Sequence, residues 1–119
     1  SSFANTDVDA KEIYNALDVV EVNVNPGITG SFKLEKSVGN LMCDKSRIIY
    51  PGTEDNYSCS LEEDNNAEDI YNALDVVEVN VNPGITGSFK LEKSVGNLVC
   101  DKSRIVYPGA EDSYFCTLL

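Results

Sequence analysis

Histidine and tryptophan are absent from this chain of 119 residues, and methionine occurs once. Without histidine, the usual base that activates a serine or cysteine nucleophile is missing. No CxxC pair occurs either, which excludes the common zinc-finger and thioredoxin-like sites. Apolar runs of the about 20 residues that span a bilayer are also absent. We therefore expect a soluble protein without a membrane span.

Basic residues are scarce. Nine Lys and Arg stand against 20 Asp and Glu, which gives a formal net charge of −11. Such a chain is repelled by phosphate backbones and anionic lipids, so nucleic-acid and membrane binding are disfavoured. The hydrophobic content of 42% is that of a folded protein, and the length suits one domain or two very small ones.

Four cysteines, Cys43, Cys59, Cys100 and Cys116, are spaced sixteen apart within each half of the chain. An even number in a short chain predicts two disulfides, Cys43–Cys59 and Cys100–Cys116, although four cysteines allow three connectivities. Disulfides indicate an oxidising compartment, so we expect a secreted protein, extracellular or periplasmic. A first residue of Ser and no leader-like start fit a mature secreted protein or a trimmed chain.

The chain is an internal duplication. At an offset of 57, residues 10–61 and 67–118 differ at eight of 52 positions, and 13–41 is identical to 70–98. A repeat of this kind sets the organisation of the whole chain. We predict repeat 1 over 1–61, an acidic linker over 62–66 and repeat 2 over 67–119, the two forming one compact pseudo-symmetric body.

Each copy begins with helical periodicity and continues with strand periodicity. Ala10, Ile13 and Leu17 share one face at three- and four-residue spacing, which predicts a helix over about 9–18 and its copy over about 66–75. The period then changes from 3.6 to 2.

Alternation in VEVNVN predicts a half-buried strand in which Val20, Val22 and Val24 face the core and the residues between them face solvent. Pro26-Gly27 has the residues of a type II turn, because proline presets φ and glycine accepts a positive φ.

Three further strands complete the unit. Phe32 and Leu34 point inward in the second strand, which breaks at Gly39-Asn40, and residues 41–50 and 57–61 form a hairpin that brings the cysteines together. The fold class is thus α+β: two tandem α-β-β-β-β repeats, each a helix packed on an antiparallel sheet, related by a pseudo-twofold axis. The copies can pack helix to helix, join edge strands into one sheet, or exchange helices.

The outward residues of the two copies are as identical as the inward ones, which stability alone does not require. Three explanations stay open: a recent duplication, a chain built to be symmetric, or the same contact made by both copies. One outward position does differ, where Ser58 is replaced by Phe115. Phe115 either packs where the symmetry is broken, belongs to a contact surface, or is an exposed aromatic without a role.

The basic residues are unevenly placed. Eight of the nine fall in 33–47 and 90–104, two segments with four acids. Cross-strand ion pairing on a solvated face explains this pattern, and a contact surface for a protein or an anionic glycan is the alternative. With Phe115, the candidate binding residues are Lys33, Lys36, Lys45, Arg47, Lys90, Lys93, Lys102 and Arg104.

No catalytic or metal site stands out. Lys36-Ser37 and Lys45-Ser46 are adjacent pairs whose side chains point to opposite faces of a strand, so neither is a dyad by itself. The carboxylates fall in helix starts, turns and the linker, where solvation and capping explain them. The groups 54–56 and 62–64 offer oxygen ligands for calcium, but no DxDxDG pattern is present. We expect no cofactor, no metal and no enzymatic activity.

In layout only, two disulfide-containing helix-and-sheet units in an acidic chain resemble the β-lactamase-inhibitor protein, and a single unit is similar to the cystatin layout. No inhibitory motif of either family is present, so no residue is carried over. The sequence leads us to expect a secreted protein-binding module, an inhibitor being one form, that is a monomer or a weak homodimer. The alternative is a structural or cell-surface assembly component. Asn56-Tyr57-Ser58 is also an N-glycosylation sequon.

Overall fold

A computed structural model describes residues 2–4, 7–48, 54–63, 66–105 and 111–119, and structural statements below refer to these ranges. The predicted Pro51-Gly52 turn, the last two residues of the strand predicted over 41–50, and Asp64 and Asn65 of the linker lie outside them.

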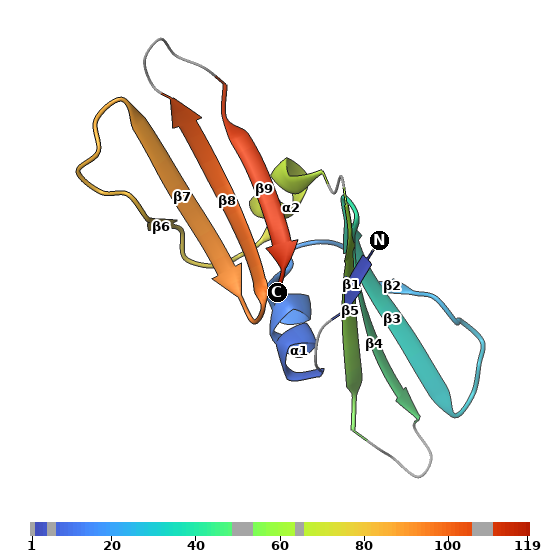
Figure 1. The fold of residues 1–119 in the computed structure, drawn as a ribbon. Coiled ribbons are helices and arrows are strands. Elements are labelled where there is room, and N and C mark those ends of the chain that lie inside the picture. Colours follow the sequence, from blue (N-terminus) through green and yellow to red (C-terminus); the bar gives the residue numbers. More distant parts are fainter. Residues whose placement is uncertain (1, 5–6, 49–53, 64–65, 106–110) are drawn as a thin grey trace.

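The chain folds as two similar halves, each with one helix and one antiparallel sheet (Figure 1). The elements of the first half are β1 (Ser2–Ala4), α1 (Asp7–Ala16), β2 (Val22–Asn23), β3 (Ser31–Val38), β4 (Leu41–Ile48) and β5 (Asn56–Glu62). Those of the second half are α2 (Ala67–Ala73), β6 (Val79–Asn80), β7 (Ser88–Val95), β8 (Leu98–Ile105) and β9 (Ser113–Leu118). The predicted α+β fold of two repeats is confirmed.

The sheets have the strand orders β1-β5-β4-β3-β2 and β6-β7-β8-β9. In each half the helix packs on one face, here called the helix face, and the opposite face is called the outer face. The helix face of the first sheet holds the buried Leu41, Cys43, Cys59 and Leu61. Their counterparts in the second half are buried in the same way.

The helices form close to where predicted: α1 has the predicted length but begins and ends two residues earlier, and α2 is shorter than predicted. Ile13 and Tyr14, and their counterparts Ile70 and Tyr71, are buried because they lie on the face that packs on the sheet. Both helices end at equivalent alanines, Ala16 and Ala73, two residues before the predicted ends.

The disulfides are the predicted ones. Cys43 lies directly opposite Cys59 in the β4–β5 register, with Cα atoms 4.0 Å apart, and Cys100 lies opposite Cys116 in the same way. Each bridge therefore joins neighbouring strands of a single repeat, and no free cysteine is found in the described residues.

Two turns follow the predicted chemistry. The amide of Ile28 donates to the carbonyl oxygen of Asn25 at 3.4 Å, across Pro26-Gly27, and Gly27 has a φ of +84°. A residue with a side chain is strained at such an angle, so glycine is required there. The hairpin between β3 and β4 turns at Gly39-Asn40, because Val38 pairs directly with Leu41.

The predicted orientation of the first strand is wrong. Val22 pairs with Glu35 and Asn23 with Leu34, so Val22 lies on the outer face and Asn23 on the helix face. Val20, Val22 and Val24 are 78%, 51% and 41% exposed. A register shifted by one residue turns every side chain of a strand to the other face, and alternation alone cannot distinguish the two registers. The strand is also only two residues long.

An additional strand, β1, pairs with β5 through Ser2↔Glu62, Phe3↔Leu61 and Ala4↔Ser60. No pattern in the sequence predicts this strand, because three residues are too few for a periodicity signal. It makes the first sheet five-stranded, whereas the second has four strands in the described residues.

The halves meet at the ends of their helices. Leu17 and Leu74 form an antiparallel bridge, with Asp18 N–H donating to Ala73 and Asp75 N–H to Ala16, both at 2.8 Å. The buried residues of both halves form one continuous cluster around this point. In the described ranges the sheets are not joined into one, and each helix packs mainly on its own sheet, with smaller contacts from α1 to β7 and from α2 to β3. The joined sheet and the exchange of helices are therefore not found, and the halves meet through the helix ends and these helix–sheet contacts.

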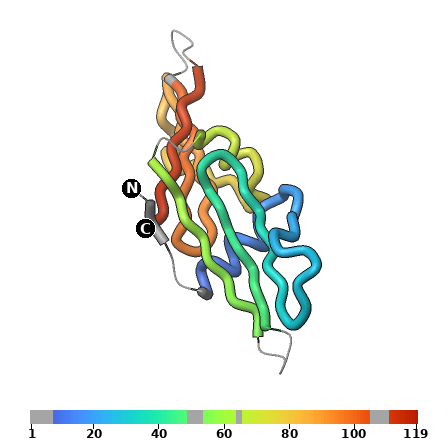
Figure 2. The backbone as a smooth tube through the Cα atoms, turned by 90° about the vertical axis from the view of Figure 1, so that its right-hand side faces the viewer, coloured from blue at the N-terminus to red at the C-terminus, as the bar shows by residue number. Residues whose placement is uncertain are grey.

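The resulting body measures 59 × 24 × 20 Å and is elongated. The two sheets extend in opposite directions from the central helices, as a view at right angles to Figure 1 also shows (Figure 2). No helix in the described ranges combines the length and apolar character needed to span a membrane.

Candidate contact surfaces

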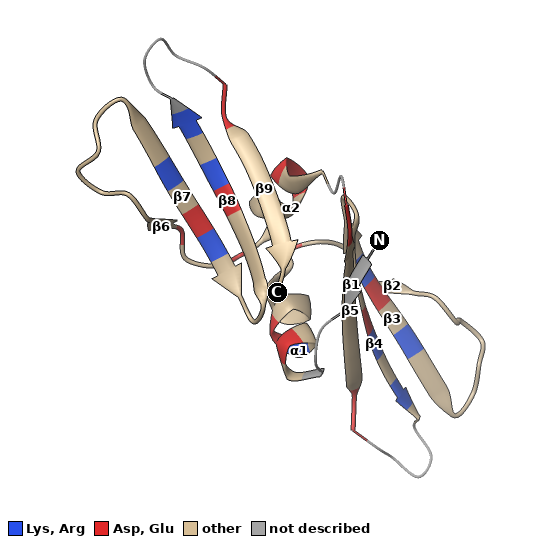
Figure 3. Ribbon diagram, viewed as in Figure 1, with Lys and Arg blue, Asp and Glu red and all other residues tan. Residues whose placement is uncertain are grey.

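The eight clustered basic residues lie on two opposite faces of the sheets. Lys33 pairs with Ser46 on the outer face, whereas Lys36 pairs with Cys43, and so lies on the helix face with Lys45 and Arg47. Lys90, Lys93, Lys102 and Arg104 divide in the same way. Along β3 and β7 an acidic residue lies between the two lysines, and along β4 and β8 an acidic residue directly precedes the lysine (Figure 3). A contact surface on one face of a sheet would thus contain only some of these eight basic residues.

On the outer face, the lysines pair with acids across the strands. Lys33 Nζ lies 3.9 Å from Asp44, and Lys90 Nζ lies 3.8 Å from Asp101. Both lysine side chains are about half exposed. Exposed pairs of this kind contribute little to stability, about 0–1 kcal/mol.

Lys36 stabilises the end of a helix. Its ammonium donates to the carbonyl oxygens of Tyr14 and Leu17, at 3.0 and 3.1 Å, and lies 4.7 Å from the centroid of the Tyr14 ring. The last carbonyls of a helix have no partner within it and carry partial negative charge, so a cation there is stabilising. Lys93 makes the same contacts in the second half. These two lysines have a folding role that the sequence analysis missed.

Arg47 and Lys45 also lie on the helix face, toward the end of β4 that is farther from the turn at Gly39-Asn40. The Arg47 guanidinium donates to Asp55 at 2.6 Å and lies 5.4 Å from the Phe32 ring centroid. This hydrogen bond lowers the pKa of Asp55 and raises that of Arg47. Lys45 Nζ is 5.9 Å from the Tyr14 ring and 6.0 Å from the Tyr57 ring. Arg104 and Lys102 repeat these contacts.

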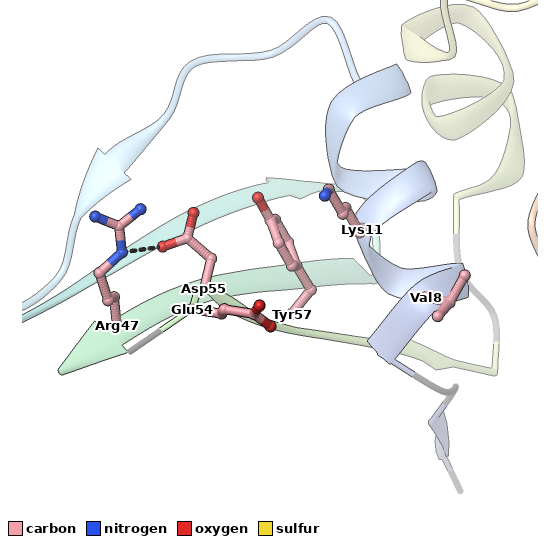
Figure 4. A pocket seen from close by; sticks show the side chains of 6 residues that line it. All are labelled: Val8, Lys11, Arg47, Glu54, Asp55 and Tyr57. Carbon is pink, nitrogen blue, oxygen red and sulfur yellow. Dashed lines mark hydrogen bonds and ion pairs between the residues drawn. The ribbon is translucent and has the colours of Figure 1, made fainter. Parts of the chain in front are cut away.

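An open hollow of about 570 Å³ lies beside this ion pair, between α1 and the ends of β4 and β5 (Figure 4). It is lined by Val8, Lys11, Arg47, Glu54, Asp55 and Tyr57. The lining carries two basic and two acidic groups. In the second half Glu68 stands where Lys11 does, so the charge balance is not repeated. A contact that both halves make alike therefore does not depend on this hollow.

Polar residues of the repeated segment are used in folding. The hydroxyl of the buried Tyr14 donates to Glu21 at 2.5 Å. Burial, this hydrogen bond and the Glu21 charge raise the pKa of Tyr14. Asn25 N–H donates to the Asn23 side chain at 3.0 Å, and the Asn25 side chain accepts from Lys33 N–H at 2.7 Å. Identical contacts recur in the second half, which gives a physical reason for repeating these residues.

Four exposed apolar residues of the same segment have no such role in the core. Val20, Val22 and Val24, here called the valine row, are exposed, and Ile28 is 58% exposed. The second half repeats this with Val77, Val79 and Val81 at 78%, 52% and 41% and Ile85 at 57%. β2 and β6 lie at the ends of their sheets, so each valine row lies at an outer edge of the molecule (Figure 1).

Phe115 lies on the outer face of β9, opposite Asp101, and is 63% exposed. It therefore does not fill a gap where the two halves meet, and a contact surface or an exposed aromatic without a role are the remaining interpretations.

In the described ranges, the structure brings no residues together for a Lys-Ser dyad or a calcium site. Lys36 and Ser37 pair with Cys43 and Met42 on opposite faces, as expected of neighbours on a strand. Across the described ranges, no three of the Cys, Asp and Glu side chains are grouped as metal ligands. Asp64 of the second calcium candidate lies outside those ranges.

The chain matches no protein-family model, no curated protein and no solved structure. The resemblance to the β-lactamase-inhibitor protein and cystatin layouts therefore remains one of layout, and function has to be argued from the surfaces above.

Proposed function

We propose that this chain is a non-enzymatic, extracytoplasmic protein-binding module with two equivalent contact sites, one at each valine row. Two disulfides support the extracytoplasmic location, because such bridges persist in oxidising compartments. The absence of histidine and the open setting of Glu54 and Asp55 beside the hollow support a role in binding rather than catalysis.

The observation that carries the proposal is the exposure of Val20, Val22 and Val24 in both halves. Folding accounts for the polar residues between them, since Glu21 binds Tyr14 and Asn25 binds the backbone of Lys33. It does not account for three β-branched apolar side chains in solvent, repeated without change. Grouped exposed apolar residues mark sites of protein contact.

The partner contacts are expected to be apolar at the centre and polar at the rim. Glu35 lies beside Val22 on the outer face, and Lys33 lies beside Val24, whose N–H donates to Lys33 O at 2.9 Å. An apolar centre with charged neighbours is the usual anatomy of a specific interface. Because the two rows lie at opposite edges of the body, each binds its own partner molecule or its own repeat of an extended partner (Figure 1).

Site-specific photo-cross-linking tests this function. A benzoylphenylalanine replaces Val22 or Val79 in the disulfide-intact protein, which is then exposed to the extracellular fraction of the organism that encodes it. The same protein is expected to be captured from both positions. Changing Val20 and Val24 to Ser should then reduce capture at Val22 without affecting capture at Val79.

The matched control carries the cross-linker at Ser58, which is exposed on the outer face of β5. Equal capture of the same protein from Ser58, or no capture from either valine, contradicts the proposed sites. Native mass spectrometry of the captured complex should show two partner molecules or two partner repeats per chain.

A further inference from the structure

The outer face of the last strand has diverged as a unit. On β5 the outward row is Asn56, Ser58, Ser60 and Glu62, and at the equivalent places β9 and the residue after it carry Ser113, Phe115, Thr117 and Leu119. All four positions differ. This second set is called the β9 outer row below.

The inward positions of the same strands have not changed. Tyr114, Cys116 and Leu118 repeat Tyr57, Cys59 and Leu61, and they face the helix in both halves. Three of these four outward positions lie within the aligned ranges 10–61 and 67–118, which differ at eight positions in all. The divergence is therefore confined to the face that the core does not use.

At the two positions of the row where the side chains differ most between the halves, a polar residue is replaced by an apolar one. Phe115 replaces Ser58 and is 63% exposed, and Leu119 replaces Glu62 and is 80% exposed. Thr117 lies between them and pairs with Val99 of β8. Folding does not require the large side chains, because the first half keeps the same inner packing with Ser and Glu in these places.

The distribution of charged residues around this row indicates which kind of partner binds it. The molecule carries a net charge of −11, yet β9 (Ser113–Leu118) contains no charged residue. Beside it on the outer face, Asp101 is already paired with Lys90 at 3.8 Å. Glu92 lies opposite Asp101 on the same face, so the charged residues of this face, Lys90, Glu92 and Asp101, belong to β7 and β8 and not to β9. A partner drawn in by charge would find little attraction on β9 itself, whereas two copies that meet at β9 place uncharged rows against each other and keep these charges at the rim.

We propose that the β9 outer row is a self-association surface, at which two copies of the chain pack their second sheets face to face around Phe115. Sheets pack in this manner in sandwich folds, with their apolar side chains interdigitated. Because only one half carries the apolar row, the contact is isologous and closes at a dimer instead of extending into a filament. This surface is separate from the valine rows.

Sedimentation equilibrium of the whole, disulfide-intact chain tests the proposal. A monomer–dimer equilibrium is expected with a Kd between about 1 µM and 1 mM. Association should strengthen in about 1 M NaCl, where the Debye length is about 3 Å and the net charges of the two copies no longer repel over distance. A chain that remains monomeric at about 1 mM protein in that salt overturns the proposal.

The deciding variant is Phe115→Ser with Leu119→Glu, which places the residues of β5 on β9. It should raise the Kd at least tenfold while circular dichroism and thermal unfolding stay as in the wild type, since the first half folds with these residues. The matched control, Met42→Ser with Ile48→Ser, removes two exposed apolar side chains from the outer face of the first sheet, outside both the β9 outer row and the valine rows, and should leave the Kd unchanged. Loss of the dimer in the control alone, or its persistence in Phe115→Ser/Leu119→Glu, overturns the proposal.

Discussion

Leu17 and Leu74 lie opposite each other in an antiparallel bridge, and the approximate twofold axis of the chain passes between them. Each is 2% exposed and follows the last turn of its helix. The reciprocal hydrogen bonds beside them, from Asp18 to Ala73 and from Asp75 to Ala16, join the two repeats at this point, and α1 also contacts β7 while α2 contacts β3.

Leu17→Ala and Leu74→Ala should each lower the free energy of unfolding by about 2–5 kcal/mol, because each leaves a cavity in the shared cluster. The two effects should be similar, and the double variant should deviate from their sum because the residues are in contact. Chemical denaturation monitored by circular dichroism measures this. Val20→Ala, at a position 78% exposed, is the control and should cost less than about 0.5 kcal/mol.

Lys36→Met keeps the aliphatic stem and removes the ammonium that binds the Tyr14 and Leu17 carbonyls. The Leu17 carbonyl oxygen then loses this donor, the Tyr14 carbonyl oxygen keeps the hydrogen bond from Leu17 N–H at 3.4 Å, and the variant should be less stable by about 1–3 kcal/mol. Lys33→Met removes an equal charge from an exposed pair and should cost about 0–1 kcal/mol. Equal losses in the two variants would show that net charge, and not the helix end, is responsible.

Alkaline pH should destabilise the fold through Tyr14 and Tyr71. Burial, followed by the hydrogen bonds to Glu21 and Glu78, raises the pKa of both groups above the unfolded value of 10.0. The folded state thus retains protons that the unfolded state releases, so their contribution is fully present below pH 10 and is lost as pH rises above it.

Denaturant unfolding as a function of pH, with tyrosinate absorbance recorded alongside, tests this expectation. Glu21→Gln should weaken the alkaline loss by lowering the folded pKa of Tyr14, and Glu78→Gln should do the same for Tyr71. Because the chain has six tyrosines, the signals of Tyr14 and Tyr71 are taken as the difference between the wild type and Tyr14→Phe or Tyr71→Phe. A difference that appears well before unfolding, with the protein still folded, would contradict a raised pKa in the folded state.

Asn56 should accept an N-linked glycan when the chain is secreted from eukaryotic cells. It is exposed at the start of β5, on the outer face, within Asn56-Tyr57-Ser58. Mass spectrometry should find one glycan that peptide N-glycosidase removes and that Ser58→Ala abolishes.

The second half provides the matched test of this site. Ser113→Asn with Phe115→Ser recreates the same triplet at the equivalent place and should add a second glycan. An unmodified Asn56 in the secreted wild-type chain would contradict the prediction.

Local signals predicted much of the architecture. Cys43 and Cys59 were assigned to one bridge because a hairpin between their segments brings them together, and the β4–β5 register does so. Pro26-Gly27 predicted its turn because only glycine tolerates the φ found there. The helix was predicted from spacing alone, because its buried face needs only contacts three and four residues apart.

The candidate sites were predicted less well, because they depend on which face a residue occupies. Lys36 and Lys33 look alike as neighbours in a basic segment, yet one stabilises a helix end and the other faces solvent. A contact between Lys36 and Tyr14 joins residues 22 positions apart, so no local pattern contains it.

The sequence by itself determined the duplication and the outward divergence between Ser58 and Phe115, and it predicted the disulfide pairing, the helix and the strands that follow it, since all of these follow from short-range spacing or from comparing the two copies. Only the tertiary structure decided that Val22 faces solvent and that Leu17 meets Leu74. The reason is physical: alternation fixes that neighbours point to opposite faces, but the pairing of Val22 with Glu35 and the packing of one repeat on the other decide which face is covered.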